Sequence, residues 1–303
     1  MKTCIIVVNF RTPWHLNKCL RSVFDCTTNF HLIIVQNSPD KESISLVNEY
    51  QGKYEGQISV ITHEKNLGFV GGINSAYSEA IKFERVCFLN SDCVVTKNWL
   101  DELNRCLDEN KSIVQISPDT NTLHIHRESF WSKILRKILP QSFQLILPQL
   151  KSNYSERGFK EYNNFYDFPG GYCNLIRTIY VADREFFIDP NIMHGYWDEF
   201  DITTYLRQFG IVGWTDKSYV FHFHNISFKK LDDKKSGLKE KLHLLNGLYI
   251  MHKWRNFVKS EISKMSKEEL LNRTDSYVIR MILTYLGMAS AIPDFDRYIE
   301  SVP

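Results

Sequence analysis

Apolar and polar positions follow each other along the first 117 residues in blocks that predict alternating strands and helices. Residues 4–8 are a continuous apolar run rich in β-branched side chains, as expected of a strand buried on both faces. Leu16, Leu20 and Val23 then recur at helical spacing within residues 14–24. The same reading predicts strands at 32–35, 58–62, 86–89 and 113–116, and helices around 44–50, 71–83 and 99–107. Strands separated by helices indicate an α/β fold with a largely parallel sheet.

This pattern changes after residue 117. Residues 118–165 show no clear strand, although 129–150 are apolar and basic and predict a helix that ends near Pro140. Strand-like segments return at 172–176 and 219–223, around a helix at 202–209. Residues 237–300 look mostly helical. The chain therefore ends in a predicted helical region.

Composition excludes several classes of protein. The 303 residues are 43% hydrophobic and 24% charged, which rules out a disordered or a collagen-like chain. Lys and Arg total 37 against 35 Asp and Glu, a net charge of +2, and so small an excess argues against a nucleic-acid partner. Aromatic residues reach 14%, which fits a large core or an aromatic-lined cleft.

The sequence has no signal-like apolar segment at its start and no apolar run of membrane-spanning length. Its seven cysteines form no C-x-x-C pair, which favours reduced thiols, and we expect a cytoplasmic protein. Residues 127–151 carry a net charge of +4 and residues 229–259 a net charge of +6. A peripheral location on the inner face of an anionic membrane is therefore one hypothesis; solvated helical faces are the alternative.

Three loops leave the carboxyl ends of the first three predicted strands, the edge at which open parallel sheets bind ligands. Their amides suit the edges of a nucleobase, and their glycines allow close backbone approach. The third loop precedes a helix, so its N–H groups could meet an anion, but it is not the G-x-G-x-x-G of a dinucleotide dehydrogenase. Ordinary turn chemistry is the alternative. The candidate nucleotide-binding residues of these loops are Asn9, Arg11, Gln36, Asn37, Asn66, Gly68 and Gly72.

A polar Asn90-Ser91-Asp92 step interrupts the apolar strand that begins near residue 86. A carboxylate there is costly to bury unless it is paired or bound to a cation. Asp92 could hold Mg²⁺ or Mn²⁺ against a diphosphate, since hard cations prefer oxygen ligands. The alternative is a local Asx turn or a helix cap.

The order of these motifs resembles glycosyltransferase family 2, whose members have the GT-A fold, and its rhamnosyltransferase-like branch in particular. The resemblance covers about residues 4–228. It is carried first by V-V-N-F, Q-N-S-P-D, E-K-N-L-G-F-V-G-G-I-N and F-L-N-S-D, and later by F-P-G-G-Y-C-N-L-I-R, Y-W-D-E-F-D and V-F-H-F-H.

The resemblance implies sugar transfer, with inversion, from a UDP- or dTDP-linked donor to a glycan or lipid-linked glycan acceptor. It implies a GT-A-type, Rossmann-like, mostly parallel sheet flanked by helices, with a helical C-terminal appendage. Residues 1–228 would be the catalytic domain, divided into a donor half (1–117) and an acceptor half (118–228). Residues 229–303 would be the helical C-terminal region.

Site residues carry over one by one. Asp92 matches the second aspartate of the family's D-x-D metal motif, and Asn90 stands at the first. Gln36 stands where an aspartate usually reads uracil or thymine; an amide both donates and accepts, so this position does not fix the base preference. His222 aligns with the histidine that completes the metal shell, while His224, on the same face of a strand, is the alternative. Donor contacts then also include Phe69, Asn74, Asn90, Ser91 and Asp92.

Glu199 matches the catalytic aspartate of the family, and Asp198 and Asp201 flank it. Inverting transfer needs a carboxylate to take the proton of the acceptor hydroxyl, while a cation stabilises the pyrophosphate. Capping of a helix N-terminus is the alternative for this acidic cluster. The implied acceptor-side residues are Gly170, Gly171, Tyr172 and Trp197.

Two functions of other classes remain open. A sugar nucleotidyltransferase would carry a glycine-rich loop after the first strand, but residues 9–13 contain no glycine. A non-catalytic nucleotide-sugar-binding protein would not need the acidic cluster at 198–201.

Overall fold

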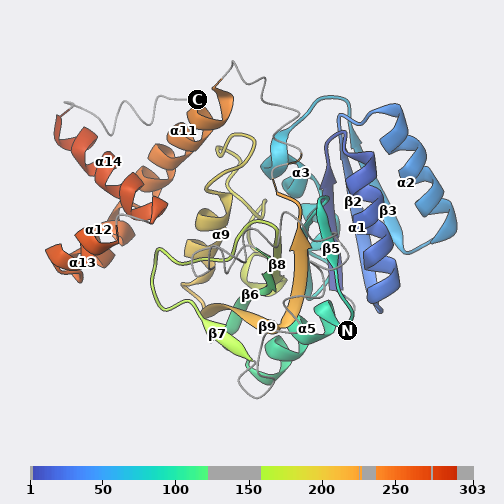
Figure 1. Ribbon diagram of the computed structural model, residues 1–303, viewed down its shortest axis with the longest axis horizontal. Coiled ribbons are helices and arrows are strands. Elements are labelled where there is room, and N and C mark those ends of the chain that lie inside the picture. The colour runs from blue at the N-terminus through green and yellow to red at the C-terminus, as the bar shows by residue number, and fades with distance from the viewer. Residues whose placement is uncertain (1–2, 122–157, 225, 227–236, 274–275, 292–303) are drawn as a thin grey trace, which may run out of the picture.

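The structure is a computed structural model, and it describes residues 3–121, 158–224, 226, 237–273 and 276–291. Its N-terminal half alternates strands and helices as the sequence predicts (Figure 1): β1 (Thr3–Asn9), α1 (Pro13–Cys26), β2 (Phe30–Asn37), α2 (Lys41–Lys53) and β3 (Ile58–His63). The three strands are parallel, and Asn9 lies opposite Gln36 in the register of β1 and β2. The carboxyl ends of these two strands therefore lie level at one edge of the sheet.

The complete sheet is mixed. β4 (Arg85–Asn90) joins β1 in parallel, whereas β8 (Cys173–Arg177) pairs with β4 in the antiparallel direction. The strand order is β3-β2-β1-β4-β8-β6-β9-β5, and β7 pairs with β9. The remaining strands are β5 (Cys93–Val95), β6 (Ile113–Thr120), β7 (Phe159–Glu161) and β9 (Ile211–His222). The parallel arrangement thus holds for β1 to β4, and β8, from the second half of the chain, pairs with β4 at the edge of this parallel part.

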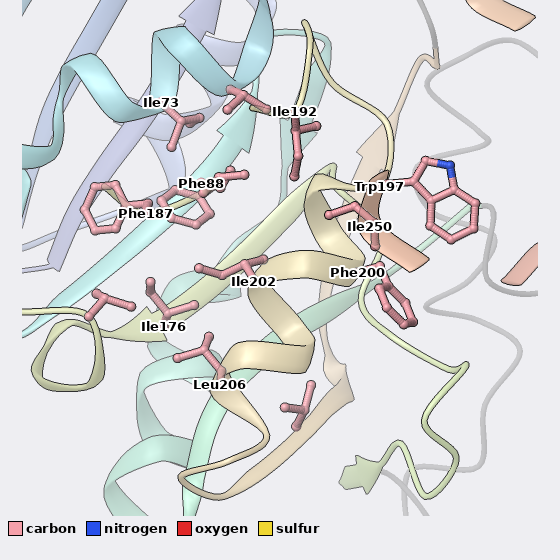
Figure 2. Close-up of a cluster of buried hydrophobic side chains, with 14 of the residues drawn as sticks. Ile73, Phe88, Ile176, Phe187, Ile192, Trp197, Phe200, Ile202, Leu206 and Ile250 are labelled. Carbon is pink, nitrogen blue, oxygen red and sulfur yellow. The ribbon is translucent and has the colours of Figure 1, made fainter. Parts of the chain in front are cut away.

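Helices cover both faces of this sheet. Ile5 and Val7 of β1 face a buried cluster that includes α1 and α5 (Trp99–Glu109). Ile6 and Val8 face a second cluster, which includes α3 (Gly68–Ser75) and α9 (Asp198–Leu206). Figure 2 shows this second cluster, with Ile73, Phe88, Phe200, Ile202 and Leu206 among its members. Because successive side chains of a strand point to opposite faces of the sheet, β1 contributes to two separate hydrophobic cores.

Several boundaries differ from the prediction. The helix expected at 71–83 begins at Gly68 and is divided into α3 and the short α4 (Tyr77–Ala80). The segment expected as a strand at 219–223 is the end of the longer β9, whose polar middle hides its apolar pattern. The strands β5 and β7 were not predicted, and a 3₁₀ turn, η3 (Thr178–Tyr180), follows β8. The predicted helix that ends near Pro140 lies outside the described residues.

The C-terminal region is helical, as predicted: α11 (Leu238–Lys253), α12 (Arg255–Ser263), α13 (Lys267–Asn272) and α14 (Tyr277–Ala291). Ile250 of α11 and Ile282 of α14 belong to the same buried cluster as Phe200 of α9, and Figure 1 shows α11 beside α9. These helices therefore share a core with the sheet. Among the helices that the structure describes, none combines the length and apolar character needed to cross a bilayer.

Candidate active site

The ends of β1 and β2 carry two buried amides with unused hydrogen-bonding atoms. Asn9 Oδ1 accepts from the N–H and the hydroxyl of Thr12, at 3.3 and 2.8 Å, but Asn9 Nδ2 has no partner among the described residues. Gln36 Nε2 donates to the Ser43 carbonyl at 3.5 Å, and Gln36 Oε1 likewise meets no donor that the structure describes. An unsatisfied buried polar group costs about 1–3 kcal/mol. A ligand with both donor and acceptor atoms would recover that energy here.

Arg11 links the first two loops. Its Nε and Nη2 donate to the carbonyl and the hydroxyl oxygen of Ser38, at 3.0 and 3.1 Å. Both residues have a positive φ, 52° for Arg11 and 55° for Ser38. The exposed guanidinium therefore keeps a positive charge at the rim of this edge.

The third loop is held by amide side chains. Asn37 Nδ2 donates to Asn66 Oδ1 at 2.8 Å and to the Gly68 carbonyl at 2.9 Å, while Asn37 Oδ1 accepts the Leu67 N–H. Asn37 is thus occupied in shaping the loop. Asn66 Nδ2, in contrast, has no partner in the described part of the chain, so Asn66 retains a donor for a ligand.

The N-terminus of α3 does not present its first N–H groups to an anion, and that expectation is wrong for Phe69 and Val70. Both N–H groups donate to the His194 carbonyl, the second at 3.4 Å. A Cβ at Gly68, whose φ is +73°, would lie 2.2 Å from His194 Cα, so the contact requires glycine. The glycine-rich loop therefore docks a segment from the second half of the chain.

Two further predicted donor contacts have structural roles. Asn74 Nδ2 donates to the Ile188 carbonyl at 2.7 Å, and Asn74 Oδ1 accepts the N–H groups of Phe187 and Ile188. A Cβ at Gly72 would lie 2.7 Å from Val8 Cγ1. Asn74 thus fixes the 187–188 segment, and Gly72 lets α3 pack on β1.

Asp92 and His222 meet at the end of β4, where Asp92 Oδ1 lies 3.1 Å from His222 Nε2. Burial opposes the ionisation of Asp92, but the hydrogen bond and charge of His222 and the Ile226 N–H outweigh it, so the pKa of Asp92 is lowered. Asn90 Nδ2 lies 3.5 Å from the same His222 nitrogen, and Ser91 is buried beside it. The N-S-D step and the late histidine strand therefore form one polar cluster.

This cluster has the donor atoms of a divalent-cation site. Ligand atoms of Asp92, Cys93 and His222 lie within 4.8 Å of one another. Burial raises the pKa of the Cys93 thiol well above its ordinary value, so Cys93 stays protonated and donates to the Tyr172 carbonyl at 3.4 Å. The His224 ring centroid lies 4.2 Å from that of His222. A carboxylate and an imidazole remain as the natural ligands, and they fit Mn²⁺ or Mg²⁺.

Tyr172 lies under this cluster and not in an open cleft. Its side chain is 4% exposed, and its hydroxyl donates to the Pro118 carbonyl at 2.6 Å. Its ring stacks on His222 with centroids 5.7 Å apart, and its carbonyl accepts the Asn90 N–H at 2.9 Å. The predicted acceptor contact is therefore corrected: Tyr172 supports His222.

Glu199 lies at the start of α9, close to the same strand. Its Oε1 accepts the Gly171 N–H at 3.1 Å, and a Cβ at Gly171 would lie 2.5 Å from that oxygen. Only glycine allows this approach. Gly170 beside it accepts a hydrogen bond from Asn174 Nδ2 at 2.9 Å. The two predicted glycines therefore shape the strand end that receives the carboxylate.

Asp198 and Glu199 are adjacent carboxyl groups that influence each other's ionisation. Burial raises the pKa of Glu199, although backbone N–H groups and a hydrogen bond with Asp198 oppose that shift. Burial and the negative charge of Glu199 raise the pKa of Asp198 well above its ordinary value. Their interaction thus favours the protonated form of Asp198 and the charged form of Glu199.

Asp201 is fully buried, and its carboxylate bonds to groups outside this pair. Its Oδ1 accepts from Lys253 Nζ at 2.6 Å and from Trp254 Nε1 at 2.9 Å. Lys253 also bridges to Asp189 at 2.6 Å. The predicted catalytic role of Asp201 is corrected, because an ion pair with the C-terminal helices occupies its carboxylate.

Trp197 is also misassigned by the sequence. It is 2% exposed, and its Nε1 donates to the His243 carbonyl of α11 at 2.9 Å. Figure 2 places it beside Phe200 in the core. His194, Tyr196 and Trp197 have positive φ values of 57°, 67° and 69°, which cost about 1–2 kcal/mol each. Segment 193–197 is therefore strained and needs outside support.

Sequence reasoning missed four residues of this region: His194, Asn246, Lys253 and Tyr277. Tyr277, at the start of α14, is 38% exposed and packs its ring against Phe168 and Trp197. Desolvation of its hydroxyl and the neighbouring negative charge of Glu199 raise the pKa of that hydroxyl. No local motif marks these positions. The best available signal in the sequence was the spacing of Asn246 and Lys253, which lie seven residues apart and therefore on one face of a helix.

Solved structures with a similar fold are glycosyltransferases. One is GalNAc-T7 with UDP, GalNAc and Mn²⁺, at a TM-score of 0.57 and 16% identity over 83% of this chain and 47% of that chain. A second is S. aureus TarS 1-349 with UDP-GlcNAc, at a TM-score of 0.55 and 15% identity over 100% of this chain and 76% of that chain. A third is the mannosyltransferase PcManGT from Pyrobaculum calidifontis with GDP-Man and Mn²⁺. Its TM-score is 0.56, and its identity is 10% over 99% of this chain and 78% of that chain. This chain spans about half of GalNAc-T7.

These likenesses establish the fold, and the predicted GT-A-type α/β architecture with a helical C-terminal region is confirmed. No curated protein matches the sequence. The family described as "Glycosyl transferase family 2" matches residues 4–180, more than half of the chain. With the Asp92–His222 cluster and the Glu199 carboxylate at the same sheet edge, the chain belongs to glycosyltransferase family 2.

Proposed function

We propose that the protein is an inverting glycosyltransferase that moves a sugar from a nucleotide-diphosphate donor to a hydroxyl of a glycan or lipid-linked glycan. One observation carries this proposal. Gly171 holds Glu199 and the adjacent Tyr172 stacks on His222. Two consecutive residues thus join a basic carboxylate to a cation site, which are the two groups that inverting transfer requires.

Glu199 is the proposed general base. The Gly171 N–H orients its carboxylate, and burial raises its pKa toward the range in which a carboxylate is a useful base. The raised pKa of Asp198 favours its protonated form, which is the form that can donate to Glu199. Glu199 removes the acceptor proton as the acceptor oxygen attacks the anomeric carbon, and the donor diphosphate leaves from the opposite face. A single displacement of this kind inverts that carbon.

Asp92 and His222 are the proposed ligands of the cation. The cation supplies positive charge that stabilises the diphosphate leaving group. Mn²⁺ suits this pair better than Mg²⁺, because Mg²⁺ favours oxygen ligands and imidazole is a nitrogen ligand. The Mn²⁺ bound with nucleotide sugar in PcManGT and with UDP in GalNAc-T7 supports the assignment.

Asn9, Gln36 and Asn66 are the proposed contacts to the nucleobase. Each keeps a buried amide atom without a partner among the described residues, as expected of groups that a ligand satisfies. UDP- or dTDP-linked donors are proposed, and the motif order favours a rhamnosyltransferase-like member of the family. Tyr277 lies near Glu199 and packs against the partly exposed ring of Phe168, and we propose that these two rings stack on the acceptor.

The proposed organisation follows the sequence division: residues 1–117 hold the donor, residues 118–228 the acceptor, and residues 229–303 form a helical region. A cytoplasmic enzyme in peripheral contact with an anionic membrane is proposed from the basic run at 229–259. Exposed Leu244 and Leu245 on α11 add an apolar component. The basic run at 127–151 lies outside the described residues.

Two other functions fit less well. Membership of a glycosyltransferase family counts against a sugar nucleotidyltransferase. A non-catalytic binding protein would retain the donor edge but would have no use for a carboxylate whose position depends on Gly171.

Calorimetric titration with UDP and Mn²⁺ tests the cation site. Asp92→Asn keeps the size of the side chain and removes its charge, so we expect Mn²⁺-dependent UDP binding to weaken by about tenfold or more. UDP binding without metal should be unchanged. Asp101→Asn, on the exposed face of α5, is the matched control. Equal Mn²⁺-dependent binding by the wild type and Asp92→Asn would remove Asp92 from the site.

A further inference from the structure

Asn246 of α11 makes four hydrogen bonds to the strained segment that precedes the catalytic helix. Its Oδ1 accepts the Met193 N–H at 3.1 Å. Its Nδ2 donates to the carbonyls of Met193, Gly195 and Tyr196 at 2.9, 2.6 and 3.3 Å. The side chain is 1% exposed, so water does not replace these bonds. One carboxamide therefore closes segment 193–197 into its left-handed conformation.

Lys253 contacts the same catalytic helix from two turns further along α11. Residues seven apart lie on one face of a helix. Lys253 Nζ lies 2.6 Å from both Asp201 Oδ1 and Asp189 Oδ2, and Tyr249 between them donates to Asp189 at 2.9 Å. One face of α11 thus fixes the chain on both sides of Glu199: before it through Asn246 and after it through Lys253.

The supported segment also reaches the donor side. The His194 carbonyl accepts the N–H groups of Phe69 and Val70 at the start of α3. A shift of segment 193–197 therefore changes the distance between the donor loop and Glu199. Because Glu199 Oε1 lies 3.1 Å from the Gly171 nitrogen, even a small displacement of Glu199 would weaken this hydrogen bond.

We propose that Asn246 is a positioning residue for Glu199, and that α11 is thereby part of the active site and not an appendage to it. The proposal rests on the proposed function, in which Glu199 is the base. Asn246 is not assigned a contact with donor or acceptor. It acts through the backbone of residues 193–197, whose positive-φ residues relax when the carboxamide is removed.

The test measures turnover per binding-competent site. Asn246→Ala and the milder Asn246→Ser are compared with Asn256→Ala, an exposed asparagine on α12. The stoichiometry of UDP–Mn²⁺ binding counts folded sites, which separates misplacement of Glu199 from loss of folded protein. We expect kcat per site for nucleotide release to fall by about 10- to 100-fold, since a displacement near 1 Å costs that much, with the donor KM within about threefold. A kcat per site within twofold of wild type in both variants would overturn the proposal.

A second measurement does not depend on activity. Backbone amide exchange, followed by mass spectrometry, is compared for peptides covering residues 68–75 and 193–206. We expect faster exchange in both regions for Asn246→Ser and no change for Asn256→Ala. Unchanged exchange in Asn246→Ser contradicts the support role. Faster exchange together with a wild type that releases no nucleotide from any donor supports the role of Asn246 and rejects the proposed function instead.

Discussion

Two neighbouring carboxyl groups at the start of α9 differ in how strongly their surroundings oppose ionisation, and that difference supports separate proposed roles. Asp198 is 5% exposed and faces the negative charge of Glu199, and its pKa is raised well above the ordinary range by burial first and by that charge second. Glu199 is only half-buried and accepts the Gly171 N–H. These surroundings suit Asp198 to the proposed role of a donor beside Glu199, the proposed base.

The protonation of Asp198 predicts a pH-dependent effect of Asp198→Asn on stability. Because the folded-state pKa is raised, the folded protein binds more protons than the unfolded chain above about pH 4, and its stability falls as pH rises through that window. An asparagine imitates the protonated form and avoids this loss, which is about 1.4 kcal/mol for each pH unit between the unfolded-state and folded-state pKa values.

The measurement is thermal unfolding of wild type and Asp198→Asn from pH 4 to 8. The advantage of the variant should be near zero at the acid end and grow with pH. An advantage that is constant across this range, or reversed at pH 8, contradicts a protonated Asp198.

Residue types alone located part of the site. Asp92 and Glu199 could be found because each interrupts an apolar run or opens a helix. Asp201 and Trp197 were misassigned because their partners, Lys253 and the His243 carbonyl, lie about 50 residues away in the chain. A local pattern cannot distinguish an acid that performs chemistry from one that a distant lysine neutralises.

At the scale of elements, the segment that begins at Gly171 contacts both parts of the candidate site, the Glu199 carboxylate and the Asp92–His222 cluster. Gly171 contacts Glu199, and Tyr172 contacts His222, Asn90 and Cys93. The sequence predicted this strand, but not that it pairs antiparallel between β4 and β6. Pairing over such separations depends on tertiary contacts that strand propensity does not encode.

Gly171→Ala is expected to impair turnover through Glu199. The added Cβ would lie 2.5 Å from Glu199 Oε1, so the carboxylate must move. We expect kcat to fall by about 10- to 100-fold with UDP–Mn²⁺ affinity little changed. Gly52→Ala, where a Cβ meets nothing within 4 Å, is the matched control. Turnover of Gly171→Ala equal to that of Gly52→Ala would contradict the contact with the base.

At the scale of the whole molecule, the near-neutral net charge is the sum of regions of opposite charge. The run at 229–259 is basic, whereas the site gathers Asp92, Asp198 and Glu199. The sequence predicted a helical C-terminal region, and the structure adds that it shares its core with α9. Only tertiary structure could reveal that α11 contacts α9 and the segment before it through Lys253 and Asn246.

Peripheral membrane contact is tested by flotation with vesicles. We expect binding to anionic vesicles at low salt, loss of binding at high salt, and none to neutral vesicles. Leu244→Asp should weaken it, because Leu244 is 44% exposed on α11, whereas Ile44→Asp, at 41% exposure on α2, should not. Absence of binding to anionic vesicles at low salt would reject the membrane hypothesis.

The role of Glu199 as the base of a nucleotide-sugar transferase is tested by nucleoside diphosphate release from wild type and Glu199→Gln. A panel of UDP-, dTDP- and GDP-linked sugars with Mn²⁺ is used, and UDP–Mn²⁺ affinity serves as the control for folding. We predict release from at least one donor by the wild type and a rate lower by about 10²- to 10⁴-fold in Glu199→Gln with affinity retained. No release from any donor by the wild type, or release by Glu199→Gln within threefold of it, would contradict this role.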